Sequence, residues 1–351
     1  MKFGRHVTFW LITFLVICAL LWLLREVLLP FVAGIAFAYI QAPLADRLER
    51  HGLNRTLASL LIVGVVTLAL IAIAILVMPL VVQQGLALLS NMPAYLVRAR
   101  DLLADPNRPW LNWINAGDSE TFSNLMGRAA SWLAAFSYSL LAGGKALVSF
   151  ASILIIMPIV TFYLIADWHR MIGILDSWIP LRHRETARAL AREIDVAISA
   201  FLRGQLAICI FLGLYYAIAL TVVGLNFGVL IGAVAGLLTF VPYIGSLTGL
   251  LVGTSVAIAQ FWPDWPWILA VIAIFVAGQF VEGNIIAPKI VGERVGLHPV
   301  MVIFAMFAFG YLFGFVGLIV AVPLAAAIAV LFRFGLRQYL ASPLYTGEKP
   351  I

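Results

Sequence analysis

Long apolar runs recur along this chain, and their length constrains its fold more than any other feature. An α-helix needs about 20 mostly apolar residues to cross a bilayer, and in lipid every backbone polar group must be paired within the protein. By this length criterion we predict helices near residues 7–24, 27–41, 57–80, 146–166, 205–223 and 268–287. The 351 residues are 64% hydrophobic and 11% charged, whereas a soluble domain carries roughly 25% charged residues. We therefore predict an all-α, polytopic integral membrane protein.

Two further apolar blocks, 228–262 and 300–335, are each interrupted near the middle. The interruptions are VPYIGS at 241–246 and GYLFG at 310–314. Each block is long enough for two limbs that are short for a hydrocarbon core of about 30 Å. We predict these blocks to be re-entrant hairpins in the C-terminal half, the first inserted from outside and the second from inside. Pairs of short spans are the alternative, and hydropathy does not choose between them.

Lysine and arginine residues gather in particular connections between the apolar runs. They occur before the first span, in the 43–55 connection, in the 167–204 connection and near the C-terminus. Because basic residues are enriched in cytoplasmic loops, we place these segments and both termini in the cytoplasm and residues 81–145 outside. Basic residues placed in this way also argue against a nucleic-acid partner, since no basic stripe interleaved with aromatic residues is present.

The same patterns divide the chain into five parts. Residues 1–80 are N-terminal transmembrane helices, and 81–145 are an extracytoplasmic amphipathic segment with breaks at Pro93, Pro106, Pro109 and Gly117. Residues 146–204 hold the fourth span and a cytoplasmic amphipathic helix over 180–203. Residues 205–340 form a C-terminal transport core, and 341–351 are a cytoplasmic tail.

In the stretch 279–323, Gly, Pro, Asn and charged residues interrupt the apolar runs. This pattern is typical of a transport site. Ionisable residues inside a membrane are expensive and mark functional positions. The candidates for the transport site are Gln279, Glu282, Asn284 and Lys289. Glu282 paired with Lys289 is a purely structural alternative, and a role in satisfying broken backbone is the structural alternative for Asn284. The candidate hairpin and helix-break residues are Pro242, Gly245, Gly283, Pro288, Gly292, Pro299, Gly310, Gly314, Gly317 and Pro323.

Several classes of chemistry lack their motifs. No G-x-x-x-x-G-K-[ST] sequence is present, which argues against direct drive by ATP. His, Cys and carboxylate residues do not cluster at metal-ligand spacing, and the two cysteines, Cys18 and Cys209, lie inside apolar runs as packing residues. We therefore expect no enzyme activity, no cofactor and no metal.

Several short blocks of the sequence resemble the autoinducer-2 exporter family, also called PerM-like permeases. They are FVPYIG at 240–245, QFVEGN at 279–284, PKIVG at 288–292, GLHP at 296–299, GFVG at 314–317 and VPLA at 322–325, with FYLIAD at 162–167 and RGQ at 203–205 upstream. The resemblance implies a bacterial inner-membrane transporter of eight spans that forms a homo-oligomer, with a pentamer as one expectation. Ser246 stands where members often have Pro, and Glu282 where many have Asp.

The resemblance implies export of autoinducer-2, a quorum-sensing signal, for some members and sodium or proton antiport for others. We predict a secondary transporter that exports a small polar organic solute such as autoinducer-2 by alternating access. A sodium (cation)/proton antiporter and a non-transporting oligomeric membrane scaffold are the alternatives. The expected partners are the small-molecule or ion substrate, the lipid bilayer and further copies of the chain.

Overall fold

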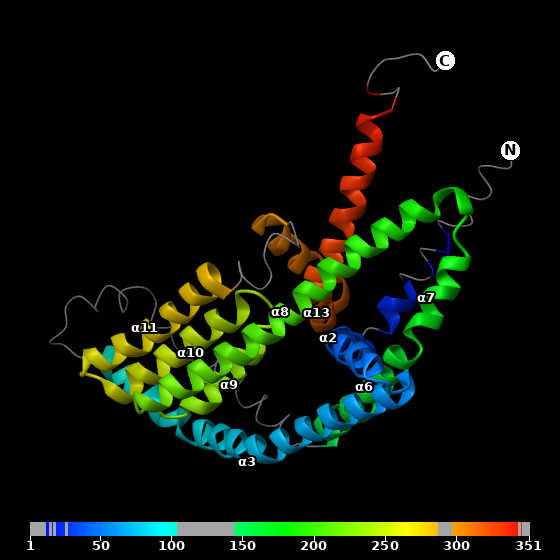
Figure 1. The fold of residues 1–351 in the computed structure, drawn as a ribbon. Helices are drawn as coiled ribbons and strands as arrows, with labels where there is room; N and C mark the ends of the chain where they lie inside the picture. The colour runs from blue at the N-terminus through cyan, green and yellow to red at the C-terminus, as the bar shows by residue number, and fades with distance from the viewer. Residues whose placement is uncertain are drawn as a thin grey trace. The chain divides into compact units, whose positions relative to one another are not determined.

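The computed structural model describes residues 12–13, 16, 19–24, 27–103, 144–286, 297–342 and 345. Within these ranges the chain is helical and contains no strand (Figure 1). It divides into two compact units. The first unit is Met1–Thr67, Ser152–Leu206 and Ala287–Ile351, and the second is Leu68–Ala151 and Ala207–Ile286.

Each unit is built from a few long helices. The first holds α2 (Leu28–Arg50), the start of α3 (Arg55–Leu103), most of α6 (Gly144–Ala166), α7 (Trp168–Ser177), a 3-10 turn (Leu181–His183), the first part of α8 (Arg184–Val222) and α13 (Pro299–Leu340). The second holds the remainder of α3 and α8 with α9 (Gly228–Leu238), α10 (Ile244–Phe261), α11 (Trp265–Val281) and the π-helical turn Glu282–Ile286.

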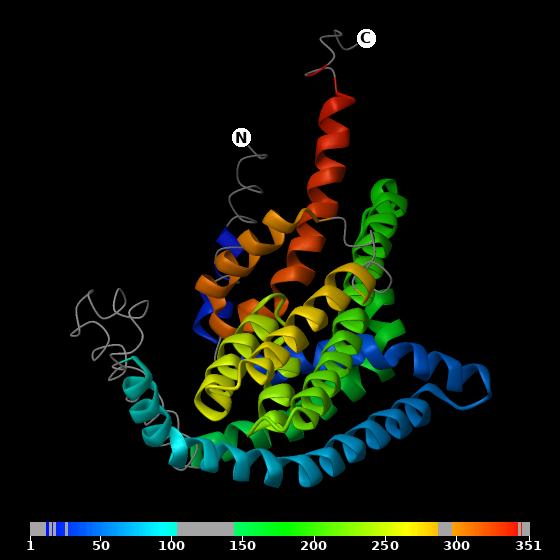
Figure 2. The same cartoon turned by 90° about the vertical axis from the view of Figure 1, so that its left-hand side faces the viewer.

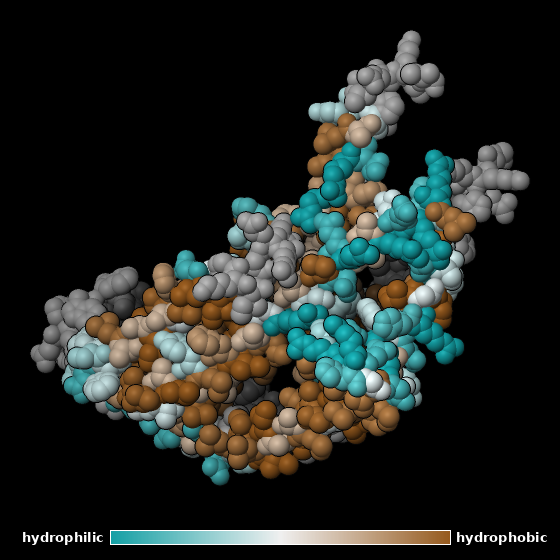
Figure 3. Space-filling view, in the orientation of Figure 1, coloured by the Kyte–Doolittle hydropathy of each residue, from teal (hydrophilic) through white to brown (hydrophobic). Residues whose placement is uncertain are grey.

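Most of the helices have the length and composition of membrane spans. Six described segments qualify, namely Leu28–Arg50, Arg55–Leu88, Leu181–Val222, Ile244–Phe261, Trp265–Ile286 and Pro299–Leu340. Residues Ser152–Ala166 of α6 pass the same test only together with α7, across a bend of 62° that fits a broken span or a re-entrant loop. Apolar side chains are widely exposed, as on α3, where Leu76 is 80% exposed (Figure 3). The all-α class is therefore confirmed, with six candidate spans in the described residues, while the count of eight spans stays a prediction.

Two predicted boundaries are wrong. Most of the amphipathic segment 180–203 and the span 205–223 form the single helix α8 (Arg184–Val222), which passes through Gly204 without interruption. A change from polar to apolar sequence does not by itself end a helix when no capping residue or proline is present. Likewise α3 continues through Pro93 to Leu103, so that proline does not break the helix. A proline removes one backbone hydrogen bond, which a long helix can tolerate as a kink. Pro106, Pro109 and Gly117 lie outside the described residues.

The two interrupted blocks are broken in the segments that the sequence indicated. In the first, α9 ends at Leu238, Tyr243 has a left-handed φ of 68°, and α10 begins at Ile244. The two helices pack side by side, with Gly245 against the backbone and hydroxyl of Thr239. In α13 the break falls at Gly314, with φ 62° and ψ −139°. Insertion of these blocks as re-entrant hairpins stays a prediction.

The α13 break folds the chain back on itself. Gly317 contacts the carbonyl of Phe309, and a Cβ placed on Gly310 would lie 2.8 Å from the Leu318 side chain. Residues eight apart along a straight helix would be separated by about 12 Å. Figure 2 shows the two limbs of α13 running in different directions from this point.

Glycines spaced four residues apart hold the second unit together. Gly232 and Gly236 on α9 lie directly against Ala217 and Gly213 on α8, without room for a side chain. Small residues at this spacing let helix backbones approach closely, which is the usual packing device in lipid. On α10, Gly249 and Gly253 receive the ring of Phe275 from α11. These contacts fix α8 and α11 around the residues described next.

Candidate functional site

Glu282 lies where α11 gives way to a π-helical turn. The α-helix ends at Val281, and Glu282 is the first residue of the turn Glu282–Ile286. Gly283 follows, and a Cβ placed on it would meet nothing within 4 Å. Single π-helical turns within α-helices are rare and occur frequently at functional sites. The Glu282 residue is only 9% exposed, and within the described ranges it is the only Asp, Glu, Lys, Arg or His residue in the buried set.

The face of α8 provides the surroundings of Glu282. Gly278, one turn before Glu282, lies against Tyr216, and a Cβ there would be 2.5 Å from the Tyr216 hydroxyl. The Tyr216 ring also packs against Phe275, with ring centroids 4.7 Å apart. Glu282 interacts electrostatically with Tyr216 and with Cys209, which lies two turns before Tyr216 on α8. The antiparallel α8 and α11 therefore enclose the carboxylate between a tyrosine and a thiol.

Two polar atoms in this enclosure have no hydrogen-bond partner. They are Oε2 of Glu282 and the hydroxyl oxygen of Tyr216. A buried polar group without a partner is costly, and an ionised one much more so. Such groups in a native structure indicate a functional role or a missing binding partner. The arrangement can accept a proton, bind a cation or receive a hydroxyl group from a solute.

The other predicted site residues have different surroundings. Gln279 is half-buried on α11. Asn284 is exposed, and its side-chain amide donates to the carbonyl of Phe280 at 3.0 Å, so it does satisfy backbone. Lys289, Pro288 and Gly292 lie outside the described residues, and a Glu282–Lys289 pair stays a prediction.

The break residues fall in both units. Pro242, Gly245 and Gly283 belong to the second unit, as Glu282 does, and the first unit holds Pro299, Gly310, Gly314, Gly317 and Pro323. Pro299 begins α13, where the His298 ring accepts a hydrogen bond from Val300 N at 3.3 Å. A proline is favoured at the first position of a helix because its missing N–H would have no partner there. Pro299 therefore has a structural role as the first residue of α13.

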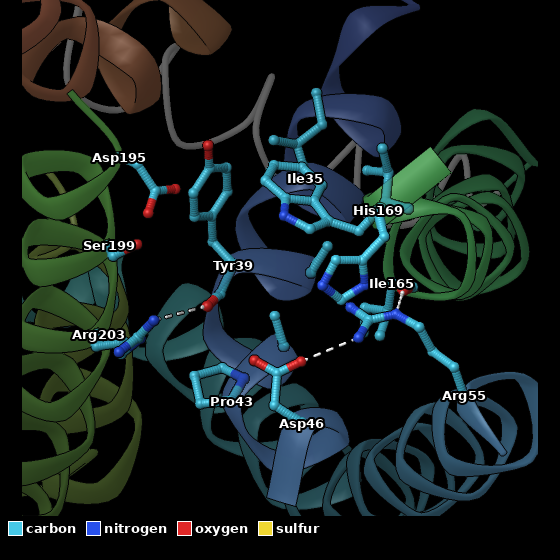
Figure 4. A pocket seen from close by; sticks show the side chains of 14 residues that line it. Ile35, Tyr39, Pro43, Asp46, Arg55, Ile165, His169, Asp195, Ser199 and Arg203 are labelled. Carbon is cyan, nitrogen blue, oxygen red and sulfur yellow. Dashed lines mark hydrogen bonds and ion pairs between the residues drawn. The ribbon is translucent and has the colours of Figure 1, made fainter. Parts of the chain in front are cut away.

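A second polar feature, which the sequence did not indicate to us, is a cavity of about 200 Å³ within the first unit (Figure 4). Residues of α2, α3, α6, α7 and α8 line it. On one side Arg55 donates to Asp46 at 3.1 Å, to Glu49 at 2.9 Å and to the carbonyl of Ile165 at 2.8 Å. This guanidinium joins the ends of three helices.

The opposite wall of the cavity comes from α8. It presents Asp195, Ser199 and Arg203, spaced four residues apart and so on one helical face. Arg203 donates to the carbonyl of Tyr39 at 3.5 Å, and Asp195 faces the Tyr39 hydroxyl (Figure 4). The Tyr39 and Trp168 rings meet edge to face, with centroids 5.7 Å apart. The spacing of four residues between these polar side chains is visible in the sequence and could have predicted this wall.

In the described ranges no group of three or more His, Cys, Asp or Glu residues could hold a metal ion.

Comparisons with known proteins agree on one class of protein, the transport proteins. The family model described as "AI-2E family transporter" matches residues 11–337. "Putative transport protein YrrI" of Bacillus subtilis is 28% identical over 323 residues, covering 90% of this chain and 89% of that protein. "Putative permease PerM" of Escherichia coli is 27% identical over 302 residues, covering 86% and 85%.

Proposed function

The chain belongs to the AI-2E family of transporters, and from that premise we propose that it exports a small polar organic solute, such as autoinducer-2, by alternating access. Family membership and the apolar helices make it a multi-pass membrane protein of a transporter family. The proposal extends this to a bacterial inner membrane, to both termini in the cytoplasm and to a homo-oligomer. A role in quorum sensing would follow from the substrate.

The observation that carries the proposal is the enclosure of Glu282. Its Oε2 atom is buried without a partner at a break between helical geometries. A transporter driven by a gradient needs a group whose protonation or binding state changes as access alternates. Carboxylates inside membranes serve this purpose in proton relays and ion pathways. A purely structural helix contact has no need of an unpaired acid.

A sodium (cation)/proton antiporter is the second candidate, because the same carboxylate could exchange a proton for a cation. The presence of only one buried acid in the described ranges favours it less, since an antiporter would usually use more than one. A non-transporting oligomeric scaffold is the third candidate. It is the only one of the three for which Glu282 has no role.

Flux through reconstituted protein tests these functions against one another. Purified chain is placed in proteoliposomes, and efflux of labelled autoinducer-2 is compared with sodium-dependent proton movement reported by a pH-sensitive dye. Solute efflux above that of protein-free liposomes supports export. Proton movement that requires sodium, without solute efflux, supports the antiporter, and neither signal supports the scaffold.

A further inference from the structure

We propose that the cavity of the first unit binds a small hydroxylated solute without net charge, and so forms a cytoplasmic docking site for the exported molecule. The assignment to export rests on the function proposed above, whereas binding in the cavity can be tested separately. The cavity lies in the 43–55 and 167–204 connections and the adjoining helix ends, which the lysine and arginine pattern places in the cytoplasm.

The size of the cavity selects small molecules. Its volume is about 200 Å³. A five-carbon sugar is of this order, whereas a nucleotide or a peptide is larger. Drug-sized ligands usually occupy roughly 300–1,000 Å³.

The charges on the α8 wall of the cavity balance one another. Asp195 supplies one negative charge and Arg203 one positive charge, whereas Arg55 across the cavity is paired with Asp46 and Glu49. A bound ion would disturb this balance, whereas a neutral solute would not. A hydroxyl group can donate one hydrogen bond and accept others, so neighbouring hydroxyls can bridge a carboxylate and a guanidinium. The lining therefore suits a neutral molecule with several hydroxyl groups.

Arg55 and Arg203 differ in how many of their hydrogen-bond donors are available to a ligand. Arg55 is engaged with two carboxylates and a carbonyl, and its side chain is only 12% exposed. Arg203 makes one long contact, 3.5 Å to the carbonyl of Tyr39. Ser199 lies between Arg203 and Asp195 on the same face of α8 and is lined up with them in Figure 4. We assign ligand binding to this α8 wall and a structural role to Arg55.

Aromatic rings complete the cavity. Tyr39 and Trp168 both line it and contact each other edge to face. A ring with hydroxyl groups has a polar rim and less polar C–H faces, and a cavity that combines aromatic surface with donors and acceptors matches both.

The test measures binding to the full chain in lipid nanodiscs by saturation-transfer NMR. D-ribose is the neutral probe, and D-ribonate and D-glucosamine are its negatively and positively charged counterparts. Asp195→Asn and Arg203→Gln are compared with Glu193→Gln and Arg192→Gln, which remove one negative and one positive charge on α8 outside the cavity. We expect wild-type protein and both controls to bind ribose more tightly than either charged probe. Each cavity variant should weaken ribose binding by about tenfold or more.

Three results would overturn the binding site. They are no ribose signal from the wild type, equal ribose binding by the cavity variants, or tighter binding of a charged probe. The export function fails independently of these results. Ribose binding without flux of autoinducer-2 leaves the site standing and rejects export, whereas flux that survives in both cavity variants rejects the site and leaves export standing.

Discussion

The Glu282 carboxylate is enclosed by Tyr216 and Cys209, neither of which supplies a positive charge. In the described part of the chain it is the only buried acidic or basic side chain. An uncompensated charge in such a place would cost several kcal/mol, so the enclosure favours a neutral acid or a bound partner. A substitution that removes the carboxylate but keeps the shape of the side chain therefore distinguishes a role in transport from a role in packing.

Glu282→Gln tests that separation. It preserves size and hydrogen-bonding capacity but removes the ability to release a proton, so we expect normal folding and an export rate lower by about tenfold or more, or a loss of pH dependence. Glu282→Asp keeps the acid and should retain both. Flux in proteoliposomes at matched protein amounts measures the effect, with Glu193→Gln as the exposed control. A wild-type rate and unchanged pH profile for Glu282→Gln would leave the residue a packing feature.

Among the helices, α13 provides the cleanest test of a break. Gly314 has a φ of 62° and a ψ of −139°, and a Cβ placed on it would meet no atom within 4 Å. The backbone conformation is therefore the only obstacle to a side chain. Gly314→Ala should lower the free energy of unfolding by about 1–3 kcal/mol, as measured by denaturant titration in mixed micelles.

Gly335 offers the matched control on the same helix. A Cβ there also meets no atom within 4 Å, and the residue has no positive φ. Gly335→Ala should leave stability unchanged or raise it by about 0.5–1 kcal/mol, since alanine is the better helix former. Equal effects of the two substitutions would mean that the break at Gly314 does not depend on glycine.

The turn between α7 and α8 is closed by Asp176. Arg188 donates to both of its carboxylate oxygens at 2.7 Å, and Arg184 approaches one of them at 2.6 Å. These hydrogen bonds lower the pKa of the Asp176 carboxyl from its ordinary value of 3.8 to about 2, and the bond from Arg188 has the largest effect. Burial of the carboxyl acts in the opposite direction. The native pKa is depressed, so the contact stabilises the turn above about pH 4 and is lost towards about pH 2.

Asp176→Asn should therefore loosen this turn at neutral pH. Trypsin should cut faster after Arg182, Arg184 and Arg188, whereas Asp167→Asn, at the start of α7, should not change the rate. The difference in thermal midpoint between wild type and Asp176→Asn should shrink as the pH falls from about 4 to about 2. A difference that is constant across this range would exclude the carboxylate as its source.

For the whole molecule, the distribution of lysine and arginine predicts one topology. A cysteine at Arg192, in a background without Cys18 and Cys209, should stay unlabelled by an impermeant maleimide in intact cells and react after permeabilisation. Arg192 is chosen because Arg188 binds Asp176. A cysteine at Ser119, in the predicted external segment, should react in intact cells. Labelling of the Arg192 cysteine from outside would reverse the assignment.

Local sequence determined the class of the molecule and the places where its helices break. The apolar runs required helices in a bilayer, because backbone groups in lipid have no other partners. Pro242 with Gly245, and Gly314, marked the interruptions, because proline and glycine limit or extend the backbone angles at the residue itself. Glu282 stood out for a similar reason, since a charge within an apolar run is visible without knowledge of any contact.

Only the tertiary structure decided what these residues touch. Tyr216 and Cys209 are far from Glu282 in sequence, and their meeting depends on close helix packing across Gly278 and the glycines of α9 and α10. The cavity near Arg203 likewise needs five helices to come together. The continuity of α8 through Gly204 was hidden because hydropathy records a change of environment and not the end of a helix. Side-chain contacts between distant segments follow from packing, which leaves no periodic signal in a single sequence.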